Sequence, residues 1–299
     1  MTTIAPRMSV HTGRNNKREN HMDHRTTKKI RLIAVDLDGT LFNSNHRVSA
    51  VTEAVLKETL ASGVQVIIAT GRNRNYVNDL LHTLGVDIPH ISSGGGVVVS
   101  GRDGALLNAR TLTLNSHLEK VLSWAEKDQI ALVGEFPDGH MRWYAAPDFL
   151  EQLPKGLSEE LSNTDRSTDP LRDYAEPVLK ISLMQMGESA YTVEDLQNFF
   201  PDLHFVYSGY NCMDLTAEGV DKGSALAYYA GQYGYEADEI AAIGDQTNDV
   251  SMLRYAALSY AMDAAPDAVK AIADVVAPGN DADGAAWAMQ QIMAHNRQV

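Results

Sequence analysis

The sequence predicts a protein of the α/β class with a second, α+β domain inserted into its core. Short, nearly continuous apolar runs at residues 30–35, 64–69 and 239–244 are typical of strands buried on both faces of a parallel sheet. A helical pattern separates the first two runs, and strand–helix–strand segments at this spacing are typical of right-handed βαβ units. Between residues 93 and 215 the alternation gives way to hairpin-like strands beside helices. We therefore expect a doubly wound, Rossmann-like parallel sheet that carries a separate inserted domain.

Residues 30–92 are predicted to form the first half of the core. After the opening strand, Ser49 can cap a helix, and Gly63 ends it in the left-handed conformation that glycine adopts easily. The apolar stripe of this helix includes Val51, Val55, Leu56 and Leu60. A second helix from about residue 74 to residue 84 and a strand near residues 90–93 repeat the α-then-β pattern.

Residues 93–215 are predicted to form the inserted α+β domain. Gly94–Gly96 open this segment, and we interpret them as a hinge between the two domains. A helix near residues 115–128 has an apolar face formed by Leu118, Val121, Leu122 and Ala125. The other predicted elements are a hairpin at 97–107, strands at 130–136, 140–145, 178–186 and 203–207, and a helix around 190–199. Residues 154–176 are polar without a clear period, which indicates loop and short helix.

Residues 216–299 are predicted to complete the core. A helix runs from Ser224 to about Tyr233 and precedes the third buried strand. Two further apolar runs, at residues 258–262 and 273–277, are predicted to be the fourth and fifth core strands. A closing helix follows Gly284.

The composition is that of a globular protein without a membrane span or a disulfide framework. The chain has 299 residues with 44% hydrophobic and 21% charged side chains. Its apolar runs are far shorter than the roughly 20 residues that span a bilayer. The single cysteine, Cys212, fits a reducing compartment, so we expect a cytoplasmic protein. The net charge of −14 disfavours binding of nucleic acid through the folded body.

Residues 1–29 differ from the rest of the chain in composition and charge. They hold seven basic side chains against two acidic ones, and they show neither apolar periodicity nor the pattern of a signal peptide. This composition favours a disordered extension, or an early start codon with Met8 or Met22 as the initiator. The alternative is a basic arm that contacts nucleic acid or an acidic partner.

Polar side chains follow the first two predicted strands at the points where these strands end. Asp36 and Asp38 close the first strand, and Thr70 and Gly71 close the second. Open α/β sheets bind ligands outside the carboxyl ends of such strands, so we expect these residues at one edge. Two carboxylates there suit a divalent cation, or a nucleophile that works beside an acid. The Thr70 hydroxyl and Gly71 amide suit a phosphate oxygen, although an isolated Thr-Gly pair is also typical of an ordinary strand exit.

The third predicted strand also ends in polar residues. Asp245 follows it directly, and Asn248 and Asp249 come within one turn. Three oxygen-bearing side chains at a strand exit resemble a site for a hard cation, of which Mg²⁺ is the usual occupant beside phosphates. The alternative is an Asp/Asn-rich turn with a helix cap. Lys222 precedes a predicted helix, where a lysine can face the ligand edge of the sheet while the helix amides support an anion.

Together, four motifs resemble those of the haloacid-dehalogenase-like phosphohydrolases, and within them the Cof-type group with a large α+β cap. The motifs are Asp36–Leu41, Thr70–Arg72, Lys222–Gly223 and Gly244–Asp249. They occur in the family's order, with a cap-sized insert between the second and the third. The resemblance covers residues 30–299. It implies a catalytic core of residues 30–92 and 216–299, and a cap of residues 93–215 that determines substrate specificity.

The resemblance implies a role for each motif. Asp36 is expected to attack phosphorus and form an aspartyl-phosphate. Asp38 is expected to protonate the leaving alkoxide and then to deprotonate water. The implied ligands of Mg²⁺ are Asp36, Asp38 through its backbone carbonyl, Asp245, and Asn248 or Asp249 directly or through water. The groups implied to bind phosphoryl oxygens are Thr70, the Gly71 amide, Lys222 and Asn248.

The resemblance therefore predicts an Mg²⁺-dependent phosphatase, a phosphoric monoester hydrolase. Its substrates are expected to be small phosphorylated metabolites such as sugar phosphates or phosphorylated cofactors. Two alternatives are open at this point. A phosphomutase would return the phosphoryl group of the same intermediate to a sugar. A regulatory protein would bind phosphate without catalysis, although intact Asp36, Asp38, Lys222 and Asp245 weigh against this.

Overall fold

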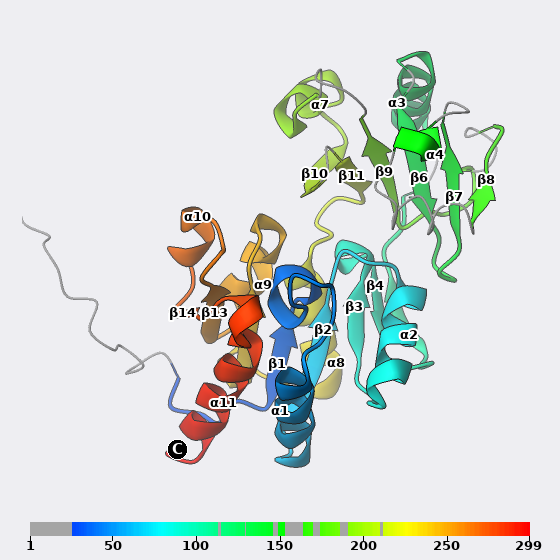
Figure 1. Ribbon diagram of the computed structural model, residues 1–299. Helices are drawn as coiled ribbons and strands as arrows, with labels where there is room; N and C mark the ends of the chain where they lie inside the picture. The colour runs from blue at the N-terminus through cyan, green and yellow to red at the C-terminus, as the bar shows by residue number, and fades with distance from the viewer. Residues whose placement is uncertain are drawn as a thin grey trace, which may run out of the picture.

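Two β-sheets organise the described part of the molecule, one in a lower core and one in an upper cap (Figure 1). The structure is a computed structural model, and it describes residues 26–112, 115–128, 130–145, 149–152, 164–169, 174–185, 191–209 and 212–299. The core sheet has eight strands and the cap sheet has six. The chain enters the cap from the core and returns to the core afterwards, so the cap is an insertion.

The core sheet has the strand order β14-β13-β12-β1-β2-β3-β4-β5. Its strands are β1 (Leu32–Val35), β2 (Gln65–Ala69), β3 (His90–Ser92), β4 (Val97–Val99), β5 (Leu106–Ala109), β12 (Ile240–Gly244), β13 (Leu258–Met262) and β14 (Val275–Ala277). The strands from β14 to β3 are parallel, and β4 and β5 extend the sheet in antiparallel pairing. Because β1 lies between β12 and β2, the polar residues that follow these strands meet at one edge.

Helices cover both faces of the core sheet. One face packs against α1 (Ala50–Ala61), α2 (Arg74–Leu84) and α11 (Gly284–Asn296). The other packs against α8 (Lys222–Tyr233), α9 (Val250–Tyr255) and α10 (Asp267–Lys270). Strand β1 supplies Ile33 and Val35 to the first face and Leu32 and Ala34 to the second, which accounts for its unbroken apolar run. The predicted doubly wound α/β class is confirmed.

The cap consists of a β-sheet with helices packed against it, and it has its own apolar core. Its strands are β6 (Ala131–Glu135), β7 (Met141–Tyr144), β8 (Asp165–Arg166), β9 (Lys180–Met184), β10 (His204–Gly209) and β11 (Cys212–Thr216). Helices α3 (Ser116–Lys127) and α7 (Val193–Phe199) pack on one face, and the short α4 (Phe149–Gln152) contributes to a cluster on the other. The four apolar residues predicted on the first cap helix are all buried. Strands β8 and β11 were not predicted, and β8 lies within the segment 154–176 that was expected to form loop and short helix.

The predicted boundaries of the cap are wrong at both ends. Strands β4 and β5 lie within the predicted insert, yet they pair with the core sheet through β3. Gly94–Gly96 therefore connect two core strands and are not the interdomain hinge. At the other end, Thr216 was assigned to the core but pairs with Lys180 in the cap sheet. Apolar hairpin strands have the same pattern in either domain, so the sequence did not separate these possibilities.

Two predictions fall largely outside the described residues. The tail prediction concerns residues 1–29, of which only residues 26–29 are described. Within that part, the Thr26 hydroxyl donates to the Asp238 carbonyl at 2.7 Å, and Lys28 forms an exposed ion pair with the Asp238 carboxylate. Most of the predicted loop at 154–176 is likewise not described. Among the described helices, none is long and apolar enough to cross a membrane.

Helix α1 begins as predicted, and Val55 and Leu56 of its predicted apolar stripe are buried, while Leu60 is partly buried against the core. The Ser49 hydroxyl accepts a hydrogen bond from the Thr52 amide at 3.0 Å, which confirms the cap. The buried stripe consists of Thr52, Val55, Leu56 and Thr59, at the i, i+3, i+4 and i+7 spacing of one helix face. Val51, predicted on the stripe, is 53% exposed because it lies beside this face.

Two substitutions in this helix test the assignment of its buried face. Leu56→Ala should lower the free energy of unfolding by about 3 kcal/mol, because Leu56 is fully buried and its loss leaves a cavity. Val51→Ala, the matched control on the same helix, should change it by less than about 0.5 kcal/mol. Urea unfolding followed by circular dichroism measures both values. Equal losses would contradict the observed orientation of α1.

Candidate active site

Asp36 follows β1 and begins a wide turn that carries the first motif. Its amide donates to the Ile243 carbonyl at 3.0 Å, which continues the pairing of β1 with β12. The turn closes through bonds from the Leu41 amide to the Asp36 carbonyl and from the Phe42 amide to the Leu37 carbonyl. At its centre Gly39 has φ +79°, a conformation that side chains disfavour.

Gly39 also lies so close to Asp245 that a Cβ would collide with the Asp245 carboxylate. Glycine at position 39 therefore lets the turn after β1 approach the turn after β12. The Thr40 hydroxyl then donates to Asp245 Oδ1 at 3.1 Å. The Gly-Thr pair of the first motif thus packs directly against the fourth motif.

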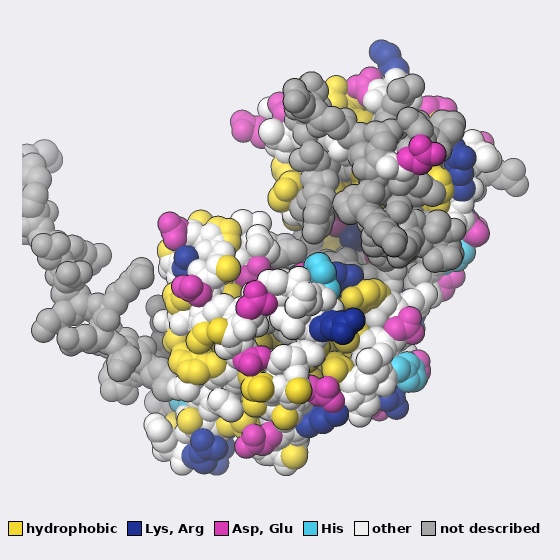
Figure 2. Space-filling model, in the orientation of Figure 1, with side chains coloured by type: hydrophobic (Ala, Val, Ile, Leu, Met, Phe, Trp, Pro, Cys, Tyr) yellow, Lys and Arg dark blue, Asp and Glu magenta, His cyan; other side chains and the backbone are white. Residues whose placement is uncertain are grey.

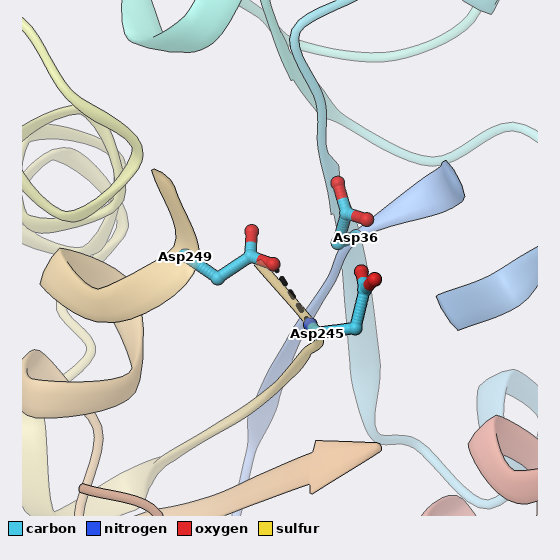
Figure 3. Close-up of side chains that lie close together, drawn as sticks. All are labelled: Asp36, Asp245 and Asp249. Carbon is cyan, nitrogen blue, oxygen red and sulfur yellow. Dashed lines mark hydrogen bonds between the residues drawn. The ribbon is translucent and has the colours of Figure 1, made fainter. Parts of the chain in front are cut away.

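Three buried carboxylates, those of Asp36, Asp245 and Asp249, converge at the carboxyl ends of β1 and β12 (Figure 3). Each offers one oxygen, and these oxygens lie within 4.8 Å of one another. Asp249 Oδ2 accepts hydrogen bonds of 2.9 Å from the amides of Asp245 and Gln246, which fold the turn around its carboxylate. The strand end and the turn together hold the three acids in a fixed cluster.

Lys222 joins this cluster from the first residue of α8. Its side chain is 1% exposed, and its ammonium donates to Asp36 Oδ1 and to Asp249 Oδ1, each at 2.6 Å. The Asp221 side chain caps the helix in front of it. Gly223 lies against the backbone of Ser251, so the Lys-Gly motif allows α8 to approach α9 closely enough for the contact with Asp249.

The buried charges shift one another's pKa values. Burial raises the pKa of Asp36, and the carboxylates of Asp249 and Asp245 add to this while Lys222 opposes it. Burial and Asp249 also raise the pKa of Asp245. Burial lowers the pKa of Lys222, but Asp249 and Asp36 more than offset it, so the net direction is upward and the ammonium stays charged. Because burial and neighbouring carboxylates raise the pKa values of Asp36 and Asp245, a further cation bound among these acids would favour their charged forms.

The donor set at this edge fits a hard divalent cation. Carboxylate and amide oxygens are its preferred ligands, and Asp36 and Asp245 offer them in a buried site. Asn248 adds a second observation: its Oδ1 atom is buried and has no hydrogen-bond partner within the described part of the chain. Buried acceptors are normally satisfied, so this oxygen is suited to a ligand at the cluster.

Asp38, the second carboxylate of the first motif, points away from the acid cluster to Arg72. Arg72 donates two 2.7 Å hydrogen bonds to it, in the parallel geometry that suits guanidinium and carboxylate groups. The Asp38 side chain is 42% exposed, and His46 lies 3.5 Å from it. The Arg72 guanidinium stacks over the Tyr76 ring at 4.2 Å. Arg72 directly follows Thr70-Gly71 and was expected near this edge, but no role at the site was predicted for it.

Thr70 and Gly71 form a loop at the same edge of the sheet. The Thr70 hydroxyl is buried and accepts a 3.2 Å hydrogen bond from the Arg72 amide. Nothing lies within 4 Å of the position that a Cβ on Gly71 would take, so there is open space beside this residue. The structure therefore brings Asp36, Lys222, Asp245 and Asp249 into one cluster and places the Thr70 loop near the Asp38–Arg72 pair at its rim.

The cap lies above this edge of the core sheet, as the ribbon view shows (Figure 1). In the space-filling view, Lys or Arg and His side chains lie on the core surface beneath the cap (Figure 2). The turn between β6 and β7 contacts the start of α2, where Asn75 donates to the Gly139 carbonyl at 3.0 Å and Arg74 to the Pro137 carbonyl at 3.1 Å. The site is thus formed where the two domains meet.

Comparison with known proteins agrees with this architecture. Residues 33–289 match the family described as haloacid dehalogenase-like hydrolase. The phosphatase YwpJ of Bacillus subtilis is 28% identical over 88% of this chain and 100% of that protein. The pyridoxal phosphate phosphatase YbhA of Escherichia coli is 28% identical over 86% of this chain and 96% of that protein. The solved structure of a haloacid dehalogenase-like hydrolase from B. subtilis has a TM-score of 0.74 and 27% identity, covering 87% of this chain and 99% of that one.

The chain belongs to the haloacid dehalogenase-like hydrolase family. The family predicted from the four motifs is confirmed, and phosphatase is the activity that the two named relatives share. The family match begins inside β1 and ends inside α11, so it includes the acid cluster, the Thr70 loop and the cap.

A pair of glycine substitutions tests the packing between the first and fourth motifs. Gly39→Ala and Gly85→Ala both place a side chain at positive φ, but a Cβ meets Asp245 at position 39 and open space at position 85. Gly85→Ala should cost about 1–2 kcal/mol of unfolding free energy from backbone strain alone. Gly39→Ala should cost about 1–3 kcal/mol more because of the collision. Equal losses in urea unfolding would show that Asp245 does not pack against this turn.

Proposed function

We propose that the protein is an Mg²⁺-dependent phosphatase that hydrolyses small phosphorylated metabolites through an aspartyl-phosphate on Asp36. The observation that carries the proposal is the buried cluster in which Lys222 bridges Asp36 and Asp249 beside Asp245. It combines a candidate nucleophile, a fixed positive charge and the donors for a divalent cation at the ligand edge of the sheet. The relatives named as phosphatases support the same class of reaction.

The residues that would hold Mg²⁺ are Asp36, Asp245 and the backbone carbonyl of Asp38, with Asn248 and Asp249 in support. Asp249 suits the supporting role because its carboxylate accepts three hydrogen bonds, from the Lys222 ammonium and two backbone amides. Asp245 instead accepts one from the Thr40 hydroxyl and one from the Gln246 side chain. Asn248 Oδ1 suits direct or water-mediated ligation because it has no partner among the described residues. When bound, Mg²⁺ would neutralise charge on the phosphoryl oxygens and orient the phosphate for attack.

In the first step, an oxygen of Asp36 forms a bond to phosphorus and the ester bond to the leaving alkoxide breaks. Both Asp38 oxygens accept hydrogen bonds from Arg72 in the unliganded protein, so Asp38 would leave this pair and take up a proton from solvent before the step. It then gives that proton to the alkoxide as it leaves. In the second step Asp38 takes a proton from water, the water oxygen attacks phosphorus, and the bond to Asp36 breaks to release inorganic phosphate. Asp38 is half exposed at the rim, which is the side from which a substrate reaches the buried nucleophile.

Positive and neutral donors hold the phosphoryl group during both steps. The Lys222 ammonium already contacts Asp36, so it lies beside the oxygens of a phosphoryl group on that residue. The Thr70 hydroxyl and the Gly71 amide face the same edge and would donate to the remaining oxygens. Such preorganised donors supply most of the catalysis in phosphoryl transfer, because the transition state spreads charge over these oxygens.

We expect a small-molecule substrate that fits beneath the cap. YbhA is named for pyridoxal phosphate, which is a small phosphorylated cofactor and supports the proposed range. The net charge of −14 and the single cysteine support action in the cytoplasm without a nucleic-acid partner for the folded body.

Replacement of the nucleophile is the direct test. Asp36→Asn should reduce turnover of phosphorylated metabolites and of p-nitrophenyl phosphate by roughly 10⁴-fold or more, because an amide does not form the covalent intermediate. Phosphate release with and without Mg²⁺ measures this. Asp103→Asn, at an exposed carboxylate paired with His82, is the matched control and should retain wild-type turnover.

Retention of activity in folded Asp36→Asn would contradict the mechanism. A wild-type protein that binds phosphate but turns over none of these substrates would instead favour the non-catalytic alternative.

The proton-transfer role of Asp38 has its own signature. Asp38→Ala should reduce the turnover of alkyl phosphates by roughly 10²–10⁴-fold, because their alkoxides need a proton to leave. It should reduce turnover of p-nitrophenyl phosphate much less, since that leaving group departs as a stable anion. Steady-state kinetics with both substrates gives the comparison. Equal losses would assign Asp38 to structure or binding instead of proton transfer.

A further inference from the structure

The cap contains a buried lysine that the proposed mechanism does not use. We propose that Lys180 is a positioning residue, which fixes the Thr70–Arg72 loop by donating a hydrogen bond from the cap to the Gly71 carbonyl. The part of this proposal that concerns phosphate rests on the proposed function. The part that concerns the conformation of the loop does not rest on it, because the hydrogen bond from Lys180 is present in the unliganded protein.

Lys180 lies at the end of the cap sheet that meets the core. It is the first residue of β9, which is flanked by β6 and β11. Its side chain is 8% exposed, and its ammonium lies 3.0 Å from Asp214 Oδ2 and 3.3 Å from Glu135 Oε1. The same ammonium donates to the Gly71 carbonyl at 3.1 Å. One lysine thus connects three cap strands to a core loop.

The backbone carbonyls of residues 70–72 accept hydrogen bonds from both domains. The Thr70 carbonyl accepts from the Gly94 amide at 3.0 Å, and the Arg72 carbonyl accepts from the Ser93 amide at 2.8 Å. These two bonds come from the core. The Gly71 carbonyl lies between them and accepts from Lys180 of the cap. The middle peptide group of the loop is therefore held from the other domain.

That middle peptide group also controls the Thr70 side chain. Its carbonyl belongs to Gly71 and its N–H to Arg72, and this N–H donates to the Thr70 hydroxyl. A rotation of the peptide would break both bonds together and would release the hydroxyl. The two groups assigned to phosphoryl oxygens, the Thr70 hydroxyl and the Gly71 amide, flank this unit. Lys180 thereby fixes both of them without touching the substrate.

The charge of Lys180 is maintained by its carboxylate partners. Burial lowers the pKa of Lys180, but Asp214 and Glu135 more than offset it, so the net direction is upward and the group remains a donor. Glu135 also accepts a 2.6 Å hydrogen bond from the Ser93 hydroxyl, on the residue whose amide holds the Arg72 carbonyl. The cluster thus contacts the loop and also the core segment that supports it.

Lys180 does not provide the only contact between the described parts of the cap and the core. The turn between β6 and β7 makes its own hydrogen bonds to Arg74 and Asn75 at the start of α2. These contacts do not involve Lys180, so the cap keeps a second attachment when the lysine is removed. A change confined to the loop can therefore be measured with the cap still in contact with the core.

The test compares three full-length variants with the wild type. Lys180→Met removes the donor, but it leaves Glu135 and Asp214 buried without their cation, which threatens folding. Lys180→Met/Glu135→Gln/Asp214→Asn removes the same donor and leaves no buried charge. Ser182→Ala is the matched control, because the Ser182 hydroxyl donates to Asp214 at 2.6 Å within the cap and does not reach the loop. Thermal unfolding identifies the variants that fold.

Two measurements decide the outcome. The first is amide hydrogen exchange of the peptide that contains residues 70–73, without ligand. The folded triple variant should exchange there at least about tenfold faster than the wild type. This factor corresponds to loss of roughly 1.4 kcal/mol, which is close to the lower end of the range for a hydrogen bond to a charged group. Ser182→Ala should leave exchange in this peptide unchanged.

The second measurement uses p-nitrophenyl phosphate with inorganic phosphate as inhibitor. In the triple variant, KM and the inhibition constant of phosphate should rise about tenfold with little change in kcat. This pattern is expected when a lost interaction stabilises the ground state and the transition state equally. A purely structural role would lower thermal stability and leave these constants unchanged. If the triple variant exchanged faster but the wild type had no phosphatase activity, the role of Lys180 in fixing the loop would stand and the proposed function would be refuted. Wild-type exchange in a folded triple variant would overturn the role of Lys180.

Discussion

The Lys222 ammonium between the carboxylates of Asp36 and Asp249 is the interaction on which the rest of the site depends. It joins the end of β1, the turn after β12 and the start of α8, which are far apart in the sequence. Removal of one partner from such a buried ion pair typically costs about 3–5 kcal/mol, because the other charge is left without compensation. The two neighbouring glycines, Gly39 and Gly223, lie where close backbone approach is required for these elements to meet.

The position of β1 in the sheet explains why these residues meet at all. It has β12 on one side and β2 on the other, and all three strands run in the same direction. Their carboxyl ends deliver Asp36, Asp245 and Thr70 to one edge, and the cap lies over that edge. The core thus supplies the charged groups, whereas the cap contributes contacts to the loop after β2.

The sequence predicted the parts of the site that are local to strand ends. Asp36 and Asp245 follow apolar runs whose burial is evident from composition alone, so their placement at one edge was predictable. The pairing of Asp38 with Arg72 was not, because it depends on the turn at Gly39 and on stacking over Tyr76. Lys180 was not predicted for a related reason. Its partners Glu135 and Asp214 come from separate cap strands, and only the strand register brings them together.

The sequence and structure also differ in where the insertion begins. The chain leaves the core sheet after β5, and Arg110, the next residue, donates a 3.1 Å hydrogen bond to the carbonyl of Glu218 on the returning segment. The two ends of the insertion are therefore neighbours, a geometry that permits one domain to be spliced into another without displacing its host. The cap is in this sense a replaceable module. Exchange of residues 111–217 for the corresponding segment of a relative would replace the surface above the site and also Lys180, while the sequence of the core strands stays unchanged.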